Sequence, residues 1–248
     1  MAPAARSVGG SGSTAMTEQT ELFETGGRQL AEGGTPSYLV HGSDDRFPIP
    51  NTAAQPYATV VRVNVTFADG SSGFGSGVMV GRNDVLTAGH VVYDRASGGY
   101  ATRIEIVPGQ GGSVHPFGET AGIRAHIPYQ YAASESFLYD IAVVQTRSDI
   151  GDLTGWLGLR SVSNPAAIEN TVIHTAGYPF DRQGGNFMYG ATDRVDFMVG
   201  NRIFYNGALD TFAGQSGSGL WLDEGGQRSV IGVHTTGGRS FNNGTALT

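Results

Sequence analysis

The sequence predicts an all-β fold built from many short strands and tight turns. Glycine accounts for 39 of the 248 residues, whereas charged residues make up only 15% of the chain. Short apolar segments are separated by Gly, Asn, Asp or Pro, which is the pattern of strands joined by turns. Long amphipathic helical segments do not occur in the sequence, which favours strands over a helical protein.

The most regular strand is expected in YATVVRVNVTF, where Val61, Val63, Val65 and Phe67 alternate with polar residues. Such alternation indicates a strand with one buried face. Further strands are expected, in chain order, at residues 77–80, 85–88, 103–107, 141–146, 171–176, 202–205 and 229–235. The turn-forming residues between nearly all of them are typical of hairpins and Greek-key connections.

The two ends of the chain differ from this pattern. Residues 1–38 are rich in Gly, Ser, Thr and Glu without a sustained hydrophobic period, which is typical of a flexible tail or a pro-segment. The N-terminus lacks the apolar centre of a secretory signal, and no apolar run approaches the ~18–20 residues of a membrane-spanning helix. Because Thr248 is suited to cap a helix, we expect a C-terminal helix beyond the end of this chain.

Composition excludes several function classes. The net charge of −7 argues against a nucleic-acid-binding protein, which needs a basic face. Cysteine is absent, so a disulfide framework, a thiolate nucleophile and a Cys-ligated metal are all excluded. We expect no cofactor, although the acidic turn Ser43–Asp45 could hold a structural calcium ion. The four histidines outside the motifs below show no metal-ligand spacing: His41, His115, His126 and His174.

Three segments carry residue types that perform chemistry together. They are VLTAGHVVYD with His90, LYDIAVV with Asp140, and DTFAGQSGSGLW with Ser216. A serine hydroxyl needs a histidine base at neutral pH, and a carboxylate must hold the tautomer of that histidine. The order His, Asp, Ser is that of the chymotrypsin template, whereas the α/β-hydrolase elbow requires a glycine where Ser218 stands. We therefore predict a catalytic triad, with the amides of Gly214 and Ser216 as the oxyanion hole.

The segments TAGHVVYD, GYPFD, LDTFAGQSGSG and VHTTGG resemble those of the bacterial glutamyl endopeptidases, a trypsin-like serine protease family. The similarity runs over residues 39–248, the expected protease domain. It implies two six-stranded antiparallel Greek-key barrels with the active site between them, and a secreted, monomeric enzyme whose pro-segment is removed. Two features depart from the family pattern: Gly219 replaces the usual proline, and the disulfides of Bacillus-type members cannot form here.

The resemblance also implies cleavage of protein or peptide substrates after Glu, and less readily after Asp. It places the substrate carboxylate against His234 in VHTTGG and against Thr211, with Thr235 and Thr236 along the same wall. An imidazole that protonates as the carboxylate arrives would form a charge-assisted hydrogen bond of about 1.5–3 kcal/mol.

Two alternatives remain open at this point. Asp210 lies six positions before Ser216, where trypsins place the aspartate that selects Lys or Arg, so a preference for basic residues is the first alternative. The second is a non-catalytic binding module on the same fold, but such modules usually lack a member of the triad.

Overall fold

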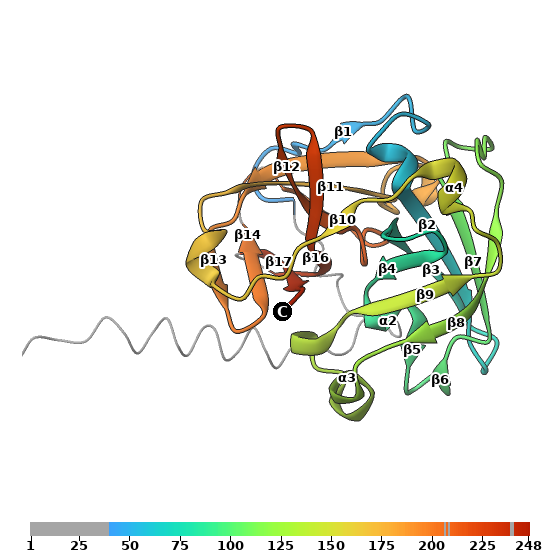
Figure 1. Ribbon diagram of the computed structural model, residues 1–248. Helices are drawn as coiled ribbons and strands as arrows, with labels where there is room; N and C mark the ends of the chain where they lie inside the picture. The colour runs from blue at the N-terminus through green and yellow to red at the C-terminus, as the bar shows by residue number, and fades with distance from the viewer. Residues whose placement is uncertain (1–39, 206, 208, 239–240) are drawn as a thin grey trace, which may run out of the picture. The chain divides into compact units, whose positions relative to one another are not determined.

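The computed structural model describes residues 40–205, 207, 209–238 and 241–248, and these belong to one compact unit. The tail or pro-segment expected at residues 1–38 lies outside the described residues. Strands dominate the described chain, and every helix is short, so the predicted all-β class is confirmed (Figure 1). The helices are η1 (Tyr57–Thr59), α2 (Gly89–Val92), α3 (Tyr129–Ser134), η2 (Phe137–Tyr139), α4 (Gly151–Thr154), η3 (Pro165–Ala167) and η4 (Gln183–Gly185).

The N-terminal half of this unit is a closed antiparallel barrel of six strands. Round the barrel the order is β2 (Val60–Thr66), β3 (Ser72–Met79), β4 (Asp84–Thr87), β9 (Ala142–Thr146), β8 (Thr120–His126) and β7 (Arg103–Pro108). The alternation predicted for β2 is confirmed, because Val61, Val63 and Val65 are buried in one hydrophobic cluster with Phe67. A small hairpin of β5 (Tyr93–Asp94) and β6 (Gly99–Tyr100) lies outside the barrel sheet.

The C-terminal half is a nine-stranded sheet. Its order is β1 (Phe47–Pro48), β12 (Tyr189–Arg194), β11 (Val172–Gly177), β15 (Gly219–Glu224), β16 (Gln227–Gly237), β17 (Asn242–Ala246), β14 (Arg202–Tyr205) and β13 (Phe197–Val199), with β10 (Gly158–Leu159) paired to β16. The resemblance implied a six-stranded barrel here. The closed six-stranded barrel of the other half agrees with that implied fold, and the described strands of this half form a larger sheet with the short strands β1 and β13 at the two ends of its order.

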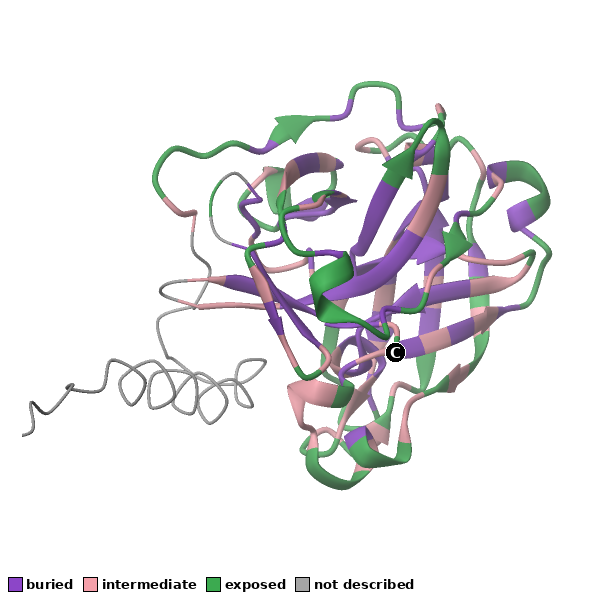
Figure 2. Cartoon of the chain, turned by 60° about the vertical axis from the view of Figure 1, so that its left-hand side comes forward, coloured by how far each residue is buried: buried purple, intermediate pink, exposed green. Residues whose placement is uncertain are grey.

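A shared hydrophobic cluster joins the two halves. Val78 and Leu86 of the barrel pack in it with Trp221 and Val233 of the sheet and with Tyr178, which follows β11, and none of these residues is more than 3% exposed. Figure 2 shows the buried residues concentrated along the strands, with exposed residues mainly in the connections. Burying side chains of this size contributes about 1.5–3 kcal/mol each, so the seam between the halves is a rigid support for side chains placed along it.

Candidate active site

His90 and Asp140 come together because their strands are neighbours in the barrel. Thr87 of β4 pairs with Ala142 of β9, so the helix after β4 and the turn before β9 lie at the same barrel end. Asp140 Oδ2 lies 2.7 Å from His90 Nδ1, and Asp140 Oδ1 accepts the backbone N–H of His90 at 2.9 Å. The Asp140 carboxylate is fully buried. It thereby holds the His90 imidazole through Nδ1 and the His90 backbone through its N–H, and leaves Nε2 to accept a proton.

The protonation of His90 is set by three opposing influences. Burial lowers the pKa of His90, the charge and hydrogen bond of Asp140 raise it, and the positive charge of Arg202 lowers it again. The net pKa of His90 lies above the ordinary value of 6.5. A base with a pKa near the working pH is effective in proton transfer, so this environment suits general base catalysis.

The loop that carries Ser216 is tied to the barrel beside His90. The Ser216 carbonyl accepts the N–H of Ser76 in β3 at 2.7 Å. Gly217 has φ +85°, and a Cβ at this position would lie 2.8 Å from Ala88 N, two residues before His90. Ser216 therefore lies next to the turn that presents His90. Within the described chain no hydrogen bond joins Ser216 Oγ to His90 Nε2.

The amides of Gly214 and of Ser216 itself have no acceptor among the described residues. Gly214 has φ +91°, a region that favours glycine, and a Cβ there would lie 2.6 Å from the Phe74 ring. The Gly214 carbonyl is turned into the seam, where it accepts Ser76 Oγ at 2.7 Å. No backbone carbonyl of the described residues accepts the amides of Gly214 or Ser216. Both predicted oxyanion-hole donors are thus available.

The predicted specificity histidine is buried and bonded to a tyrosine. His234 on β16 is 3% exposed, and its Nδ1 lies 2.6 Å from Tyr205 Oη on β14. Burial, together with the positive charges of His90 and Arg202, lowers the pKa of His234 to about 3. Burial also raises the pKa of Tyr205 well above 10, with Arg202 opposing. Near neutral pH both rings are therefore uncharged, and the phenol keeps its proton.

Of the three threonines predicted for the pocket, Thr211 lies in the loop before Ser216, and Thr235 and Thr236 follow His234 on β16. Thr211 is buried, at 2% exposure, in the loop that leads to Ser216. Thr235 Oγ1 donates to the carbonyl of Asn243 at 3.4 Å. Thr236 Oγ1 donates to Asn243 Oδ1 at 2.6 Å and accepts Nη2 of Arg202 at 2.9 Å. The hydroxyl protons of Thr235 and Thr236 are thus used inside the protein.

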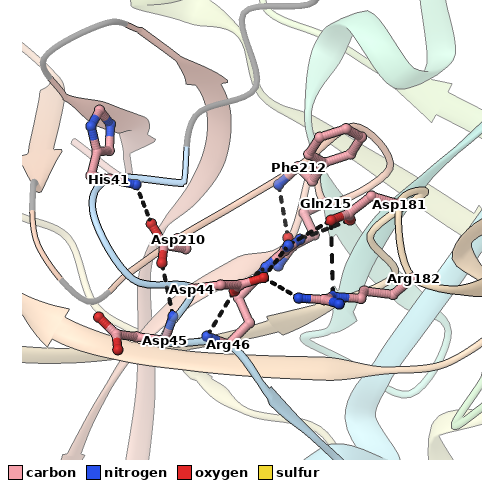
Figure 3. A network of polar contacts seen from close by, with 9 residues as sticks. All are labelled: His41, Asp44, Asp45, Arg46, Asp181, Arg182, Asp210, Phe212 and Gln215. Carbon is pink, nitrogen blue, oxygen red and sulfur yellow. Dashed lines mark hydrogen bonds and ion pairs between the residues drawn. The ribbon is translucent and has the colours of Figure 1, made fainter.

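Asp210 points toward residues 41–45, the first part of the described chain. Its buried carboxylate accepts the backbone N–H of His41 at 2.8 Å through Oδ1 and that of Asp45 at 2.9 Å through Oδ2 (Figure 3). Two amide donors satisfy this charge without a substrate cation. The sequence could not reveal this orientation, because the partners lie 169 and 165 residues away.

Beside Asp210 lies a cluster of four charged residues that sequence analysis missed (Figure 3). Arg46, whose side chain is fully buried, forms paired hydrogen bonds with Asp44 and with Asp181, and Arg182 also pairs with Asp44. The side-chain hydrogen bond from Arg46 is the largest of the contacts that hold the pKa of Asp44 below its ordinary range. The acidic turn considered for calcium is therefore engaged with arginines. The described residues contain no group of three or more His, Asp or Glu that could hold a metal ion.

Comparisons with known proteins identify relatives of the whole unit. The profile of a family described as Trypsin matches residues 49–247. A glutamyl endopeptidase of Bacillus licheniformis is 31% identical over 217 residues, which cover 84% of this chain and 65% of that protein. A Bacillus subtilis protein named Extracellular metalloprotease is 32% identical over 218 residues, covering 86% of this chain and 67% of that protein. The chain thus spans about two thirds of the length of these relatives.

A solved structure shows the same similarity in three dimensions. The structure of a Glu endopeptidase in complex with MPD superposes with a TM-score of 0.73 at 30% identity, covering 85% of this chain and 94% of that chain. The protease Anisep of Arthrobacter nicotinovorans shares the fold, with a TM-score of 0.64. Among the described helices, none has the length and apolarity to cross a membrane.

Proposed function

Because the chain belongs to the trypsin family, we propose that it is a secreted serine endopeptidase that cleaves peptide bonds after glutamate, and less readily after aspartate. The observation that carries this proposal is the buried pair of His90 and Asp140, 2.7 Å apart, beside the loop of Ser216. A protein or peptide is the substrate, the enzyme acts as a monomer, and the reaction uses no cofactor.

Each proposed catalytic residue has one role. Asp140 holds Nδ1 of His90, so Nε2 takes the proton of Ser216 as its oxygen attacks the substrate carbonyl. The amides of Gly214 and Ser216 donate to the resulting oxyanion. His90 then returns the proton to the leaving amine. Water next attacks the acyl carbon as His90 takes its proton, and His90 passes this proton to Ser216 Oγ as the acyl–oxygen bond breaks.

The preference for glutamate is assigned to His234. If Tyr205 Oη donates to Nδ1, the proton of the neutral imidazole sits on Nε2, which has no partner among the described residues. That N–H can donate to the substrate carboxylate, and the charge-assisted bond contributes about 1.5–3 kcal/mol. Since about 1.4 kcal/mol is a factor of ten, glutamate would be favoured over glutamine by roughly ten- to a hundredfold. The relatives named glutamyl endopeptidases support this assignment.

Residues 39–248 form the proposed protease domain, and residues 1–38 are proposed as a pro-segment or tail. If the segment blocks the pocket, treatment with a second protease should activate the enzyme toward a glutamyl peptide. Equal activity before and after removal of the segment would show that it is a tail without a control function.

Matched peptides that differ only in the residue before the cleaved bond test the specificity. We expect the rate order Glu, then Asp, then Gln, with Lys the slowest. A preference for Lys would establish the basic-specificity alternative and reject the role of His234. Covalent labelling of Ser216 by an organophosphonate separates both from a non-catalytic binding module, which would remain unlabelled.

A further inference from the structure

Two buried arginines of this protein have opposite surroundings. Arg46 is enclosed by the carboxylates of Asp44 and Asp181. Arg202, on β14, is 3% exposed and donates to neutral oxygens instead: Nη1 to the Phe137 carbonyl at 3.0 Å and Nη2 to Thr236 Oγ1 at 2.9 Å. Its guanidinium carbon also lies 5.3 Å from the centre of the Phe137 ring. No carboxylate of the described residues lies within ion-pair distance of Arg202.

A buried guanidinium without an anion is unfavourable, because the lost hydration is not replaced by an opposite charge. Burial lowers the pKa of Arg202 to about 10, while Asp140 and Tyr205 act in the other direction. Arg202 is therefore still charged near neutral pH. An anion that comes near from outside would therefore be attracted to this charge.

The position of Arg202 shows where that anion would lie. Thr236, which holds Nη2, is two residues beyond His234 on β16, and Phe137, which holds Nη1, is three residues before Asp140. The titratable groups that feel the charge of Arg202 are His90, Asp140, Tyr205 and His234. Arg202 is thus held by one group two residues from His234 and by another three residues from Asp140.

We propose that Arg202 is a specificity-determining positioning residue, whose buried and unpaired positive charge attracts the glutamate carboxylate that His234 binds. This inference rests on the proposed preference for glutamate. The charge is already desolvated when the substrate arrives, so the carboxylate gains its attraction without a further cost at Arg202. A glutamine side chain of the same shape gains nothing from it. The neutral rings of His234 and Tyr205 do not supply this charge themselves.

A different role would leave a different kinetic signature. If Arg202 only supported Asp140, its loss would slow the cleavage of every substrate by the same factor. If it attracts the substrate carboxylate, the loss falls on glutamyl peptides and mainly on KM. The ratio of kcat/KM for matched Glu and Gln peptides separates the two roles.

The test is Arg202→Met, with Arg160→Met as the control. Arg160 pairs with Glu224 on the surface, and its side chain is 40% exposed. For R202M we expect the Glu/Gln ratio to fall about tenfold or more, while the Gln rate changes by less than about threefold. R160M should keep the Glu/Gln ratio of the wild-type protein, and Arg202→Lys, which keeps the charge, should retain most of that ratio.

The pH–rate profile measured with the Gln peptide gives a second readout. Its acid limb should move to higher pH in R202M, because the pKa of His90 rises when the positive charge of Arg202 is removed.

An unchanged ratio in R202M, or equal losses for Glu and Gln, would overturn the proposal. If R202M does not fold, Asn243→Asp answers the same question, since Thr236 Oγ1 bridges Asn243 Oδ1 and Arg202. The new carboxylate gives Arg202 an internal anion, so the Glu/Gln ratio should again fall, and an unchanged ratio contradicts the inference. The Glu/Gln ratio of the wild-type protein is measured first. If the wild-type protein does not prefer Glu, the proposed function itself is refuted, independently of the variants.

Discussion

Tyr205 Oη and His234 Nδ1 lie 2.6 Å apart and join β14 to β16 across the intervening strand β17. Both side chains are buried, and at neutral pH neither ring carries a charge. The contact therefore orients the imidazole without neutralising a positive charge in the pocket. A substrate carboxylate can then accept the N–H of His234 Nε2, which no group of the described residues accepts.

Replacing Tyr205 with Phe should weaken the preference for glutamate. The change removes the partner of Nδ1 and leaves a buried polar atom unpaired, which costs about 1–3 kcal/mol. We expect the Glu/Gln ratio of kcat/KM to fall about tenfold, with little change for the Gln peptide. Tyr129→Phe is a suitable control, because Tyr129 is 83% exposed. An unaltered ratio in Y205F would show that the tyrosine does not orient His234.

Activity should fall on the acid side at a pH set by His90. The pKa of His90 is raised above 6.5, so the base becomes protonated, and kcat/KM declines, as the pH falls through that higher value. Asp140→Asn removes the raising influence and the bond that fixes the tautomer. We expect kcat to drop by about 10⁴ and the acid limb to move to lower pH. A pH–rate profile of the Gln peptide measures both, and an acid limb that stays in place in D140N would contradict this assignment of the limb.

His234 should make the fold sensitive to acid. Its pKa is about 3 in the folded protein and about 6.5 when unfolded, so the unfolded chain binds the extra proton between these values. The stability from the neutral imidazole is present above the unfolded pKa and is lost as the pH falls toward the folded pKa, by at most about 1.4 kcal/mol per pH unit. Urea unfolding at pH 6.5 and pH 4.5 should show a smaller loss for His234→Gln than for the wild-type protein. Equal losses would place His234 in an exposed, freely titrating environment.

The charged cluster of Asp44, Arg46, Asp181 and Arg182 should stabilise the fold. Arg46→Met removes the buried arginine that Asp44 and Asp181 share. Because both carboxylates are partly exposed and Arg182 still pairs with Asp44, we expect a loss of about 1–3 kcal/mol. Arg82→Met removes an exposed pair with Asp152, for which we expect a loss below about 1 kcal/mol. Urea denaturation of both variants gives the comparison. Equal losses would mean that the buried cluster contributes no more than a surface pair.

Local sequence patterns were sufficient for the barrel strand β2 and marked the segments that contain His90 and Asp140, whereas the pairing of these two residues follows from the neighbouring strands β4 and β9. The strand β8 was missed, because most of its residues are at least partly exposed and Ile123 is 56% exposed, so the strand shows no alternation. Residues 202–205 were expected as a strand, but the pairing of Tyr205 with His234 depends on strand order in a sheet built from distant segments. The surroundings of Arg202 depend on the same long-range packing. Sequence patterns report local periodicity, whereas these contacts are set by topology.

The most direct test of the account is the activity of Ser216→Ala on a glutamyl peptide. The variant removes the nucleophile and leaves the amide of residue 216 in place, so we predict a fall in kcat of about 10⁴–10⁶. Ser113→Ala, which changes an exposed serine, should match the wild-type protein. A Ser216→Ala protein that still hydrolyses the peptide at the wild-type rate would contradict the claim that Ser216, His90 and Asp140 act as one catalytic unit.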